Sequence, residues 1–136
     1  MPSLKLAPSR YSIGQLARMF GMTHRAIRFY EQIGLLEPGR NGQQRDYRRR
    51  DYQRLAVIAR ARKAGLKLEH IRELLDLYDP ADHGEAQVSK AIERLRQRVE
   101  DLDAQRDCVM EQLSELQAQL QRQQAAAPRE ALRSTG

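Results

Sequence analysis

The sequence predicts a mainly α-helical protein with a winged helix-turn-helix head followed by a long antiparallel coiled-coil dimerisation helix. Short amphipathic segments punctuated by glycine fill residues 11–78, and a turn-rich stretch interrupts them at 37–47. Apolar residues then follow a heptad from 88 to 120. The expected organisation is a flexible amino-terminal segment at 1–10, a winged helix-turn-helix head at 11–78, a hinge at 79–87, a coil at 88–120 and a disordered tail at 121–136.

Two short helices are expected on either side of Gly21. The first spans Ser12 to Phe20, with one apolar stripe and a capping-box pair at its start. Thr23 is a good N-cap for the second helix, and Gly34 ends it. Two short helices joined by a tight glycine-containing turn are the outline of a helix-turn-helix.

The residues after this pair predict a wing and two further helices. Turn residues between 37 and 47 lie among residues compatible with extended structure, which indicates a small hairpin. A third helix is expected from Asp51 to just before Gly65, and a fourth from about Leu68 to Tyr78. Proline at position 80 ends the fourth helix because it disfavours helical geometry in the preceding residue.

The long apolar stripe predicts a coiled coil about 48 Å in length. Its a and d positions hold Val88, Ile92, Leu95, Val99, Leu102, Val109, Leu113, Leu116 and Leu120, with Arg106 at the one interrupted position. No other predicted helix is long enough to receive this stripe, which favours a second copy over packing on the chain's own head. Residues 90–98 hold four basic and one acidic side chain, whereas 99–115 hold one basic and six acidic. Antiparallel pairing therefore sets opposite charges against each other.

Charge divides the chain into unlike halves. Residues 10–67 hold 14 basic and four acidic side chains, and residues 68–136 hold nine and 14. A basic head indicates a polyanion as partner. No apolar run is long enough to span a membrane, and the single cysteine, Cys108, cannot form an internal disulfide, so a cytoplasmic protein is expected. The sequence shows no phosphate loop and no nucleophile with a nearby base, so we expect neither an enzyme nor a cofactor.

The basic residues of the head stand where a DNA-binding surface needs them. The second helix places Thr23, His24, Arg25 and Arg28 opposite or beside its apolar stripe, which includes Tyr30. An exposed cationic first turn fits the major groove, where arginine reaches guanine edges or phosphates. The hairpin adds Arg40 and Arg45, and Lys63 ends the third helix. These positions predict binding to double-stranded DNA.

Four runs of the sequence resemble the DNA-binding head of the MerR family of transcriptional regulators. They are YSIGQLARMFGM (11–22), HRAIRFYEQIGLL (24–36), RDY (45–47) and RARKAGLKLEHIRELL (60–75), and the coil that follows matches the family's layout. Gln44 departs from the pattern, since the family usually has tyrosine before the wing arginine, so one wing contact is expected to differ in this chain.

The resemblance implies a homodimer joined by antiparallel long helices, with a recognition helix in each major groove. It implies DNA contacts from Arg25, Arg28 and Tyr30 of the recognition helix, Arg45 and Tyr47 of the first wing, and Lys63 of the second. Members of the family typically bind a palindrome between the −35 and −10 promoter elements. Effector binding lets them bend and untwist the spacer so that RNA polymerase can use both elements.

The sequence does not identify the effector or the target operon, and it does not decide between repression and activation. His83 stands where metal sensors of the family have cysteine, and Cys108 alone cannot build a closed metal site, so no metal site is expected. Residues 42–47 and 71–79 resemble the subgroup associated with branched-chain amino acid and acyl-CoA catabolism. The alternatives are a stress or redox sensor of the same family, with the role of Cys108 open, and an architectural DNA-binding protein without an effector.

Overall fold

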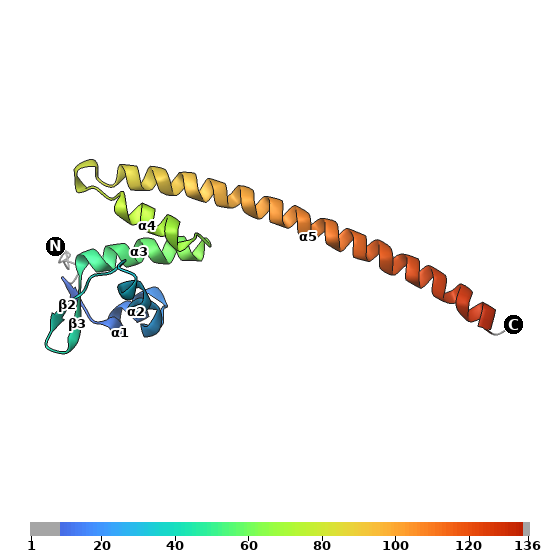
Figure 1. Ribbon diagram of the computed structural model, residues 1–136, viewed down its shortest axis with the longest axis horizontal. Coiled ribbons are helices and arrows are strands. Elements are labelled where there is room, and N and C mark those ends of the chain that lie inside the picture. The colour runs from blue at the N-terminus through green and yellow to red at the C-terminus, as the bar shows by residue number, and fades with distance from the viewer. Residues whose placement is uncertain (1–8, 135–136) are drawn as a thin grey trace, which may run out of the picture. The chain divides into compact units, whose positions relative to one another are not determined.

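The computed structural model describes the backbone of residues 9–134 and the side chains of residues 9–127. The chain divides into two compact units between Leu95 and Arg96. The predicted winged helix-turn-helix head with a long carboxy-terminal helix is confirmed (Figure 1). The elements are β1 (Arg10–Tyr11), α1 (Ile13–Phe20), α2 (His24–Gln32), β2 (Gly39–Asn41), β3 (Gln44–Arg48), α3 (Arg49–Lys63), α4 (Leu68–Asp76), the 3-10 turn η1 (Pro80–Asp82) and α5 (Glu85–Ser134).

Local capping explains where α1 and α2 begin and end. The Ser12 hydroxyl accepts a hydrogen bond from the Gln15 amide at 3.1 Å, and the Gln15 side chain accepts one from the Ser12 amide at 2.8 Å. This reciprocal pair is the predicted capping box. Gly21, at φ 62°, ends α1 in the left-handed conformation. The Thr23 hydroxyl then accepts from the Ala26 amide at 3.0 Å and starts α2.

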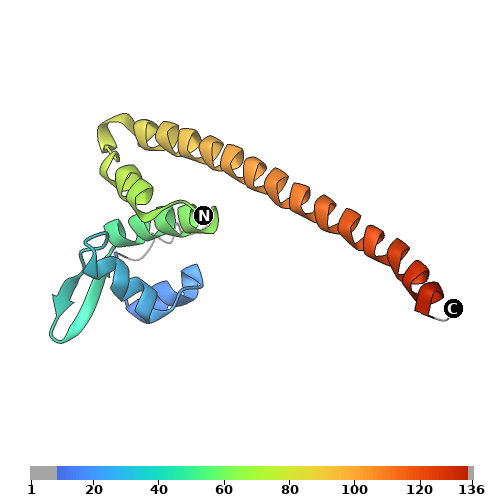
Figure 2. The ribbon, with the colours of Figure 1, turned by 45° about the vertical axis from the view of Figure 1, so that its right-hand side comes forward.

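A three-stranded antiparallel sheet in the order β1-β3-β2 forms the wing and its base. The hairpin of β2 and β3 projects beyond the helices of the head (Figure 2). Strand β1 is a correction to the predicted flexible segment at 1–10, because Arg10 pairs with Arg48 and Tyr11 pairs with Tyr47. Burial of the Tyr11 ring against the core favours the ordered strand. Residues 1–8 of the predicted segment lie outside the described residues.

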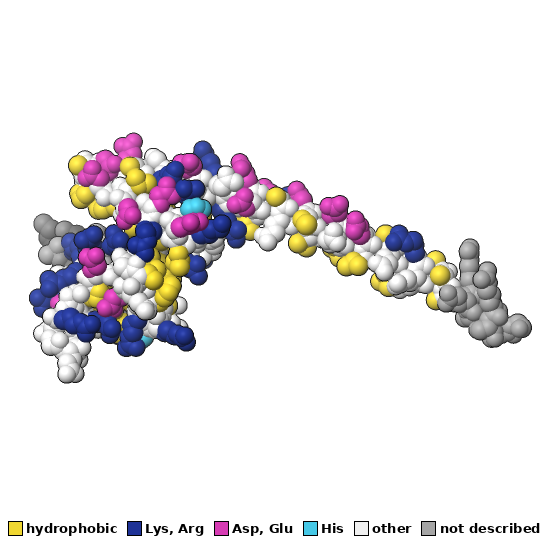
Figure 3. Space-filling view, in the orientation of Figure 1, with side chains coloured by type: hydrophobic (Ala, Val, Ile, Leu, Met, Phe, Trp, Pro, Cys, Tyr) yellow, Lys and Arg dark blue, Asp and Glu magenta, His cyan; other side chains and the backbone are white. Residues whose placement is uncertain are grey.

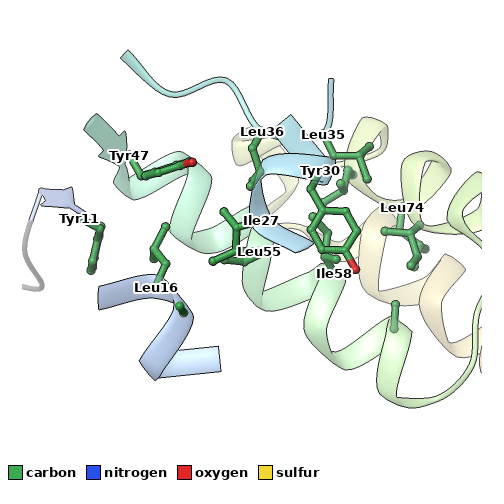
Figure 4. Packing of buried hydrophobic residues seen from close by; sticks show 14 of the residues in the cluster. Tyr11, Leu16, Ile27, Tyr30, Leu35, Leu36, Tyr47, Leu55, Ile58 and Leu74 are labelled. Atoms are coloured by element: carbon green, nitrogen blue, oxygen red, sulfur yellow. The ribbon is translucent and has the colours of Figure 1, made fainter. Parts of the chain in front are cut away.

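The core of the head lies between the helices and the inner side of β3 (Figure 4). It is built from Tyr11, Leu16, Ile27, Tyr30, Leu35, Leu36, Tyr47, Leu55, Ile58, Leu74 and their buried neighbours. Asp51 is also buried, at 3% exposure, and its carboxylate accepts from the amides of Glu37 at 2.9 Å and Arg48 at 3.0 Å. Helix α3 therefore begins at Arg49, two residues before the predicted start, because Asp51 caps it from within its first turn.

The predicted hinge at 79–87 is shorter in the structure, since α5 begins at Glu85. The Asp82 carboxylate accepts from the amides of Gly84 at 2.8 Å and Ala86 at 3.3 Å, which satisfies donors in the first turn of α5. Helix α5 then runs to Ser134, so the predicted disordered tail at 121–136 is helical as far as the backbone is described. Glutamine, alanine and arginine favour helix even where the heptad has ended.

Candidate nucleic-acid interface

Helix α2 separates a cationic outer face from an apolar inner face. His24, Arg25 and Arg28 are exposed, whereas Ile27 and Tyr30 lie in the core. Thr23 is exposed as well, but its hydroxyl already accepts the capping hydrogen bond. The first turns of α2 thus offer positively charged side chains to a partner without disturbing the packing beneath them.

Glu31 joins the wing to this helix. One oxygen of its carboxylate, Oε2, accepts hydrogen bonds from Arg45 Nε at 2.7 Å and from the Tyr47 hydroxyl at 3.3 Å. Both donors lie on β3, and the ion pair is partly shielded from solvent. A charge-assisted hydrogen bond of this kind is stronger than a neutral one. The orientation of the wing relative to the recognition helix is therefore fixed by side chains as well as by the backbone.

The pKa of Tyr47 reflects the same cluster. Burial raises the pKa of Tyr47 to about 12, and the charge and hydrogen bond of Glu31 add to the rise. The guanidinium charges of Arg45 and Arg28 act on the pKa of Tyr47 in the opposite direction. Arg28 of α2 and Arg45 of the wing, two of the predicted DNA contacts, therefore both contribute to the electrostatics of this cluster.

The two tyrosines expected to contact DNA are core residues in this structure. Tyr47 is fully buried and Tyr30 is 7% exposed, with the Tyr30 ring packed 5.7 Å from that of Phe29 between centroids. Aromatic rings on the inner stripe of a helix or strand remove a large apolar area from water. Tyr47 thus acts on the surface indirectly, by donating to Glu31.

Lys63 is exposed at the end of α3, where the second wing was predicted. In the space-filling view, lysine and arginine side chains gather over the head, with few acidic groups among them (Figure 3). Sequence reasoning missed Glu31 and Asp51, the two carboxylates that organise this surface. A signal for Glu31 was present in the sequence, because it is the one acidic residue between 24 and 36. A lone carboxylate in a cationic run indicates an internal partner.

Two arginines hold the end of α2. Arg54 Nε donates to the carbonyl oxygen of Leu35 at 2.7 Å, and Arg72 donates to that of Ile33 at 2.5 Å. They satisfy the carbonyl group of the C-cap residue Ile33 and that of Leu35 in the loop that follows the helix. Not every arginine of the basic head is therefore available to a nucleic acid.

The predicted dimerisation residues all lie in solvent in the single chain. Val88, Ile92, Leu95, Val99, Leu102, Val109, Leu113 and Leu116 are between 40% and 62% exposed. Apolar side chains of the long helix recur along one edge in Figure 3. An exposed apolar stripe of this length is unusual on the surface of a monomer.

The described part of the chain holds neither a cluster of metal-binding side chains nor a helix that could span a membrane. Within residues 9–127, no three His, Cys, Asp or Glu side chains are grouped so that they could hold a metal ion. Among the helices of the described residues, none combines the length and the apolar character needed to cross a bilayer. Cys108 is exposed on α5.

Known proteins resemble the chain along most of its length. The family model described as MerR HTH family regulatory protein matches residues 11–78, and the model described as MerR, DNA binding matches residues 52–129. The HTH-type transcriptional regulator ZntR of Escherichia coli K12 is 37% identical over 114 residues, which cover 82% of this chain and 77% of that protein. The regulator HmrR of Rhizobium leguminosarum bv. viciae is 38% identical over 78 residues, 57% of this chain and 60% of HmrR.

Solved structures show the same likeness. The HTH-type transcriptional regulator SkgA of Caulobacter crescentus is 32% identical and superposes with a TM-score of 0.52, covering 82% of this chain and 80% of that one. A MerR-family regulator of Bacillus cereus has a TM-score of 0.62 at 23% identity, over 77% of this chain and 75% of its own. The Bacillus structure is similar in fold.

Proposed function

This chain belongs to the MerR family of helix-turn-helix regulatory proteins, and from that premise we propose that it acts as a homodimer on a palindromic promoter site. It is a DNA-binding transcriptional regulator. One observation carries the proposal: the exposed cationic turns of α2 are held to the wing through Glu31. A recognition helix in the major groove and a wing on flanking phosphates are compatible with that arrangement.

The exposed heptad stripe supports the homodimer. Its apolar side chains need a second surface to leave water, and a second copy supplies an identical stripe. The basic segment 90–98 and the acidic segment 99–115 favour antiparallel pairing. A two-fold dimer presents two recognition helices to two half-sites, which is why the proposed operator is a palindrome.

We further propose that the dimer bends and untwists the promoter spacer for RNA polymerase. Bending a DNA site of about 20–30 base pairs costs on the order of 1–6 kcal/mol. Phosphate contacts from two heads can offset this cost. The sequence resemblance at residues 42–47 and 71–79 supports a branched-chain amino acid or acyl-CoA catabolism operon as the target. The protein then works in the cytoplasm, on the nucleoid.

Footprinting tests the proposal directly. Full-length protein is incubated with the DNA upstream of its own gene and of the neighbouring divergent promoter. We expect protection of a palindrome between the −35 and −10 elements, with a hypersensitive centre that reports the bend. Absence of protection at low salt, where phosphate contacts are strongest, would contradict it. The protected genes also separate a catabolic operon from a stress or redox regulon.

Arg28→Ala tests the recognition helix. Arg28 is exposed on α2, so its loss is expected to weaken binding to the footprinted site by about 1–3 kcal/mol if it reads a base edge. Fluorescence anisotropy on the operator and on scrambled DNA measures the loss of specificity. Arg60→Ala, which removes an exposed charge from α3, is the matched control. Equal affinities for the two variants on the operator would remove Arg28 from the interface.

A further inference from the structure

A cavity of about 630 Å³ lies between α3, the end of α4 and the start of α5, where the head joins the long helix. Its volume falls within the range of pockets that bind small molecules, about 300–1,000 Å³. All the residues that line it belong to the first unit of the chain, between positions 50 and 87. None of them is among the predicted DNA contacts.

One part of the cavity wall is apolar. Val57 of α3 and Leu75 of α4 contribute aliphatic side chains, and Tyr78 and Pro80 follow from the connection to α5. Tyr78 is 50% exposed, although an aromatic ring of its size normally removes much more of its surface from water. An apolar chain or ring lying against Tyr78 would cover that surface.

The polar part of the wall carries two cations, Arg50 and Arg54, and one carboxylate, Asp76. The hydrogen bond from Arg54 Nε to the Leu35 carbonyl fixes the guanidinium group in place. Burial and the charge of Arg50 lower the pKa of Arg54, while Asp76 acts in the opposite direction. Two cations close enough to affect each other, at the edge of a partly apolar cavity, favour an anionic ligand.

The cavity also contacts the element that carries the dimerisation stripe. Gln87, in the first turn of α5, lines the cavity and donates from Nε2 to the Leu74 carbonyl at 3.0 Å. One and two turns further on, Lys90 and Arg94 of α5 pair with Glu73 of α4. A ligand in the cavity therefore touches the junction through which the head is held to the beginning of α5.

We propose that this cavity binds a small organic anion with an apolar chain or ring, and that its occupancy changes the affinity of the protein for DNA. The effect of the anion on DNA affinity rests on the proposed function, whereas the binding of the anion in the cavity does not. A ligand shifts an equilibrium only if it binds one state better than another. The arginine pair supplies the selectivity for the charge, and the apolar wall around Tyr78 supplies the selectivity for the chain.

Calorimetric titration of the full-length protein with octanoate tests the binding. We expect a dissociation constant below about 1 mM, which corresponds to roughly −4 kcal/mol. Acetate has the charge without the chain, and 1-octanol has the chain without the charge, so each should bind at least about tenfold more weakly. No octanoate binding, or equal binding of octanoate and octanol, would overturn the proposal.

Arg50→Gln removes one cation from the cavity without filling it. We expect this variant to bind octanoate about tenfold more weakly and to leave octanol binding unchanged. Arg60→Gln lies on the same helix outside the cavity and serves as the control. Gln53→Glu is a second variant, because it adds a negative charge to the wall and should also weaken octanoate binding. Equal octanoate affinities in the Arg50 and Arg60 variants would exclude this cavity as the site.

Anisotropy with operator DNA separates the two proposals. DNA binding without octanoate tests the proposed function, and a change of about fivefold or more with octanoate tests the regulation. Binding of DNA without binding of octanoate leaves the proposed function standing and overturns the cavity. If the protein binds octanoate in a way that depends on Arg50 but does not bind DNA, the cavity proposal stands and the proposed function is overturned. Octanoate binding that leaves DNA affinity unchanged overturns the regulatory half.

Discussion

The head and the coil treat the same kinds of apolar residue in opposite ways. In the head, Leu16, Ile27, Leu55 and Ile58 are fully buried against neighbouring helices of the same chain. In the coil, side chains such as Val109 and Leu116 are more than 60% exposed. The residues compared lie in regular helices in both regions, so a helix in this molecule can form without being part of a buried core.

The difference follows from how apolar residues are spaced. In the head they recur within helices of eight to 15 residues, which turns and glycines fold back on one another. In the coil they recur along a single helix of 50 residues, which cannot fold back on itself. The head is therefore complete within one chain, while the coil presents a surface that a second chain can complete.

The largest effect is expected from breaking the coil. Leu95→Gln with Leu102→Gln replaces two d positions by polar residues of good helix propensity, so the helix should persist while the dimer separates. Sedimentation should then report monomers, and affinity for the palindrome should fall by at least about 100-fold because avidity is lost.

A matched double variant tests whether position, rather than glutamine itself, causes the change. Ala104→Gln with Glu111→Gln alters the outward f positions of the same helix and should leave the dimer intact. A dimer that survives the changes at Leu95 and Leu102 would show that the stripe is not the interface.

An intermediate effect is expected from Tyr47→Phe, which removes the hydroxyl group of a tyrosine buried in the head. Residues 96–136 of the coil contain no tyrosine. The unfolded chain loses the phenol proton near pH 10, whereas the folded protein holds it to about pH 12. The contribution of the protonated Tyr47 phenol to the free energy of unfolding is therefore fully present below pH 10. It decreases by roughly 2 kcal/mol as the pH rises to about 12.

The phenylalanine variant should lose the hydrogen bond to Glu31 and show a flatter decline over this alkaline window. Denaturant unfolding at several pH values between 9 and 12 measures both effects. If the two proteins decline in parallel, Tyr47 does not carry the pH dependence.

The smallest effect is expected where the head meets the beginning of α5. The hydrogen bond from Arg94 lowers the pKa of Glu73, and Arg94 and Lys90 add to this by their charges. The resulting stability is present above the ordinary carboxyl pKa of 4.5 and is lost as pH falls through the lower folded value.

Glu73→Gln should remove this acid-dependent contribution. Thermal unfolding at pH 7 and pH 3 measures it as the difference between the two melting temperatures. Glu69→Gln removes an exposed carboxylate from the same helix as a control. If Glu69→Gln reduces the difference in melting temperature between pH 7 and pH 3 as much as Glu73→Gln does, the ion pairs of Glu73 are not the cause of the acid dependence.

Local signals predicted most of the fold. The capping pair at Ser12, the glycine that ends α1 and the heptad of α5 each depend on residues close in sequence. Strand β1 was missed because its pairing joins Tyr11 to Tyr47, which no local pattern indicates. The Pro80–Asp82 turn and its Asp82 cap shortened the hinge for a similar reason, since the cap depends on the geometry of the turn.

The candidate nucleic-acid interface was predicted only in part, because a local sequence pattern describes one helix and not its contacts with other elements. Helical periodicity placed His24, Arg25 and Arg28 outside and Ile27 inside, as the structure has them. It could not show that Glu31 holds Arg45, because the two residues are 14 positions apart on different elements. Nor could it show that Arg54 lies at a cavity beside Tyr78, which requires the helices to be packed.

The Asp51 carboxylate has a consequence for how this protein can diverge. It accepts from the amides of Glu37 and Arg48, which flank the wing, and so fixes the base of the hairpin from a separate helix. The tip at residues 41–44 is exposed and lies outside that clamp. Exposed loop tips tolerate insertions well. The wing can therefore change its length and its reach along DNA during evolution while the head beneath it keeps the same structure.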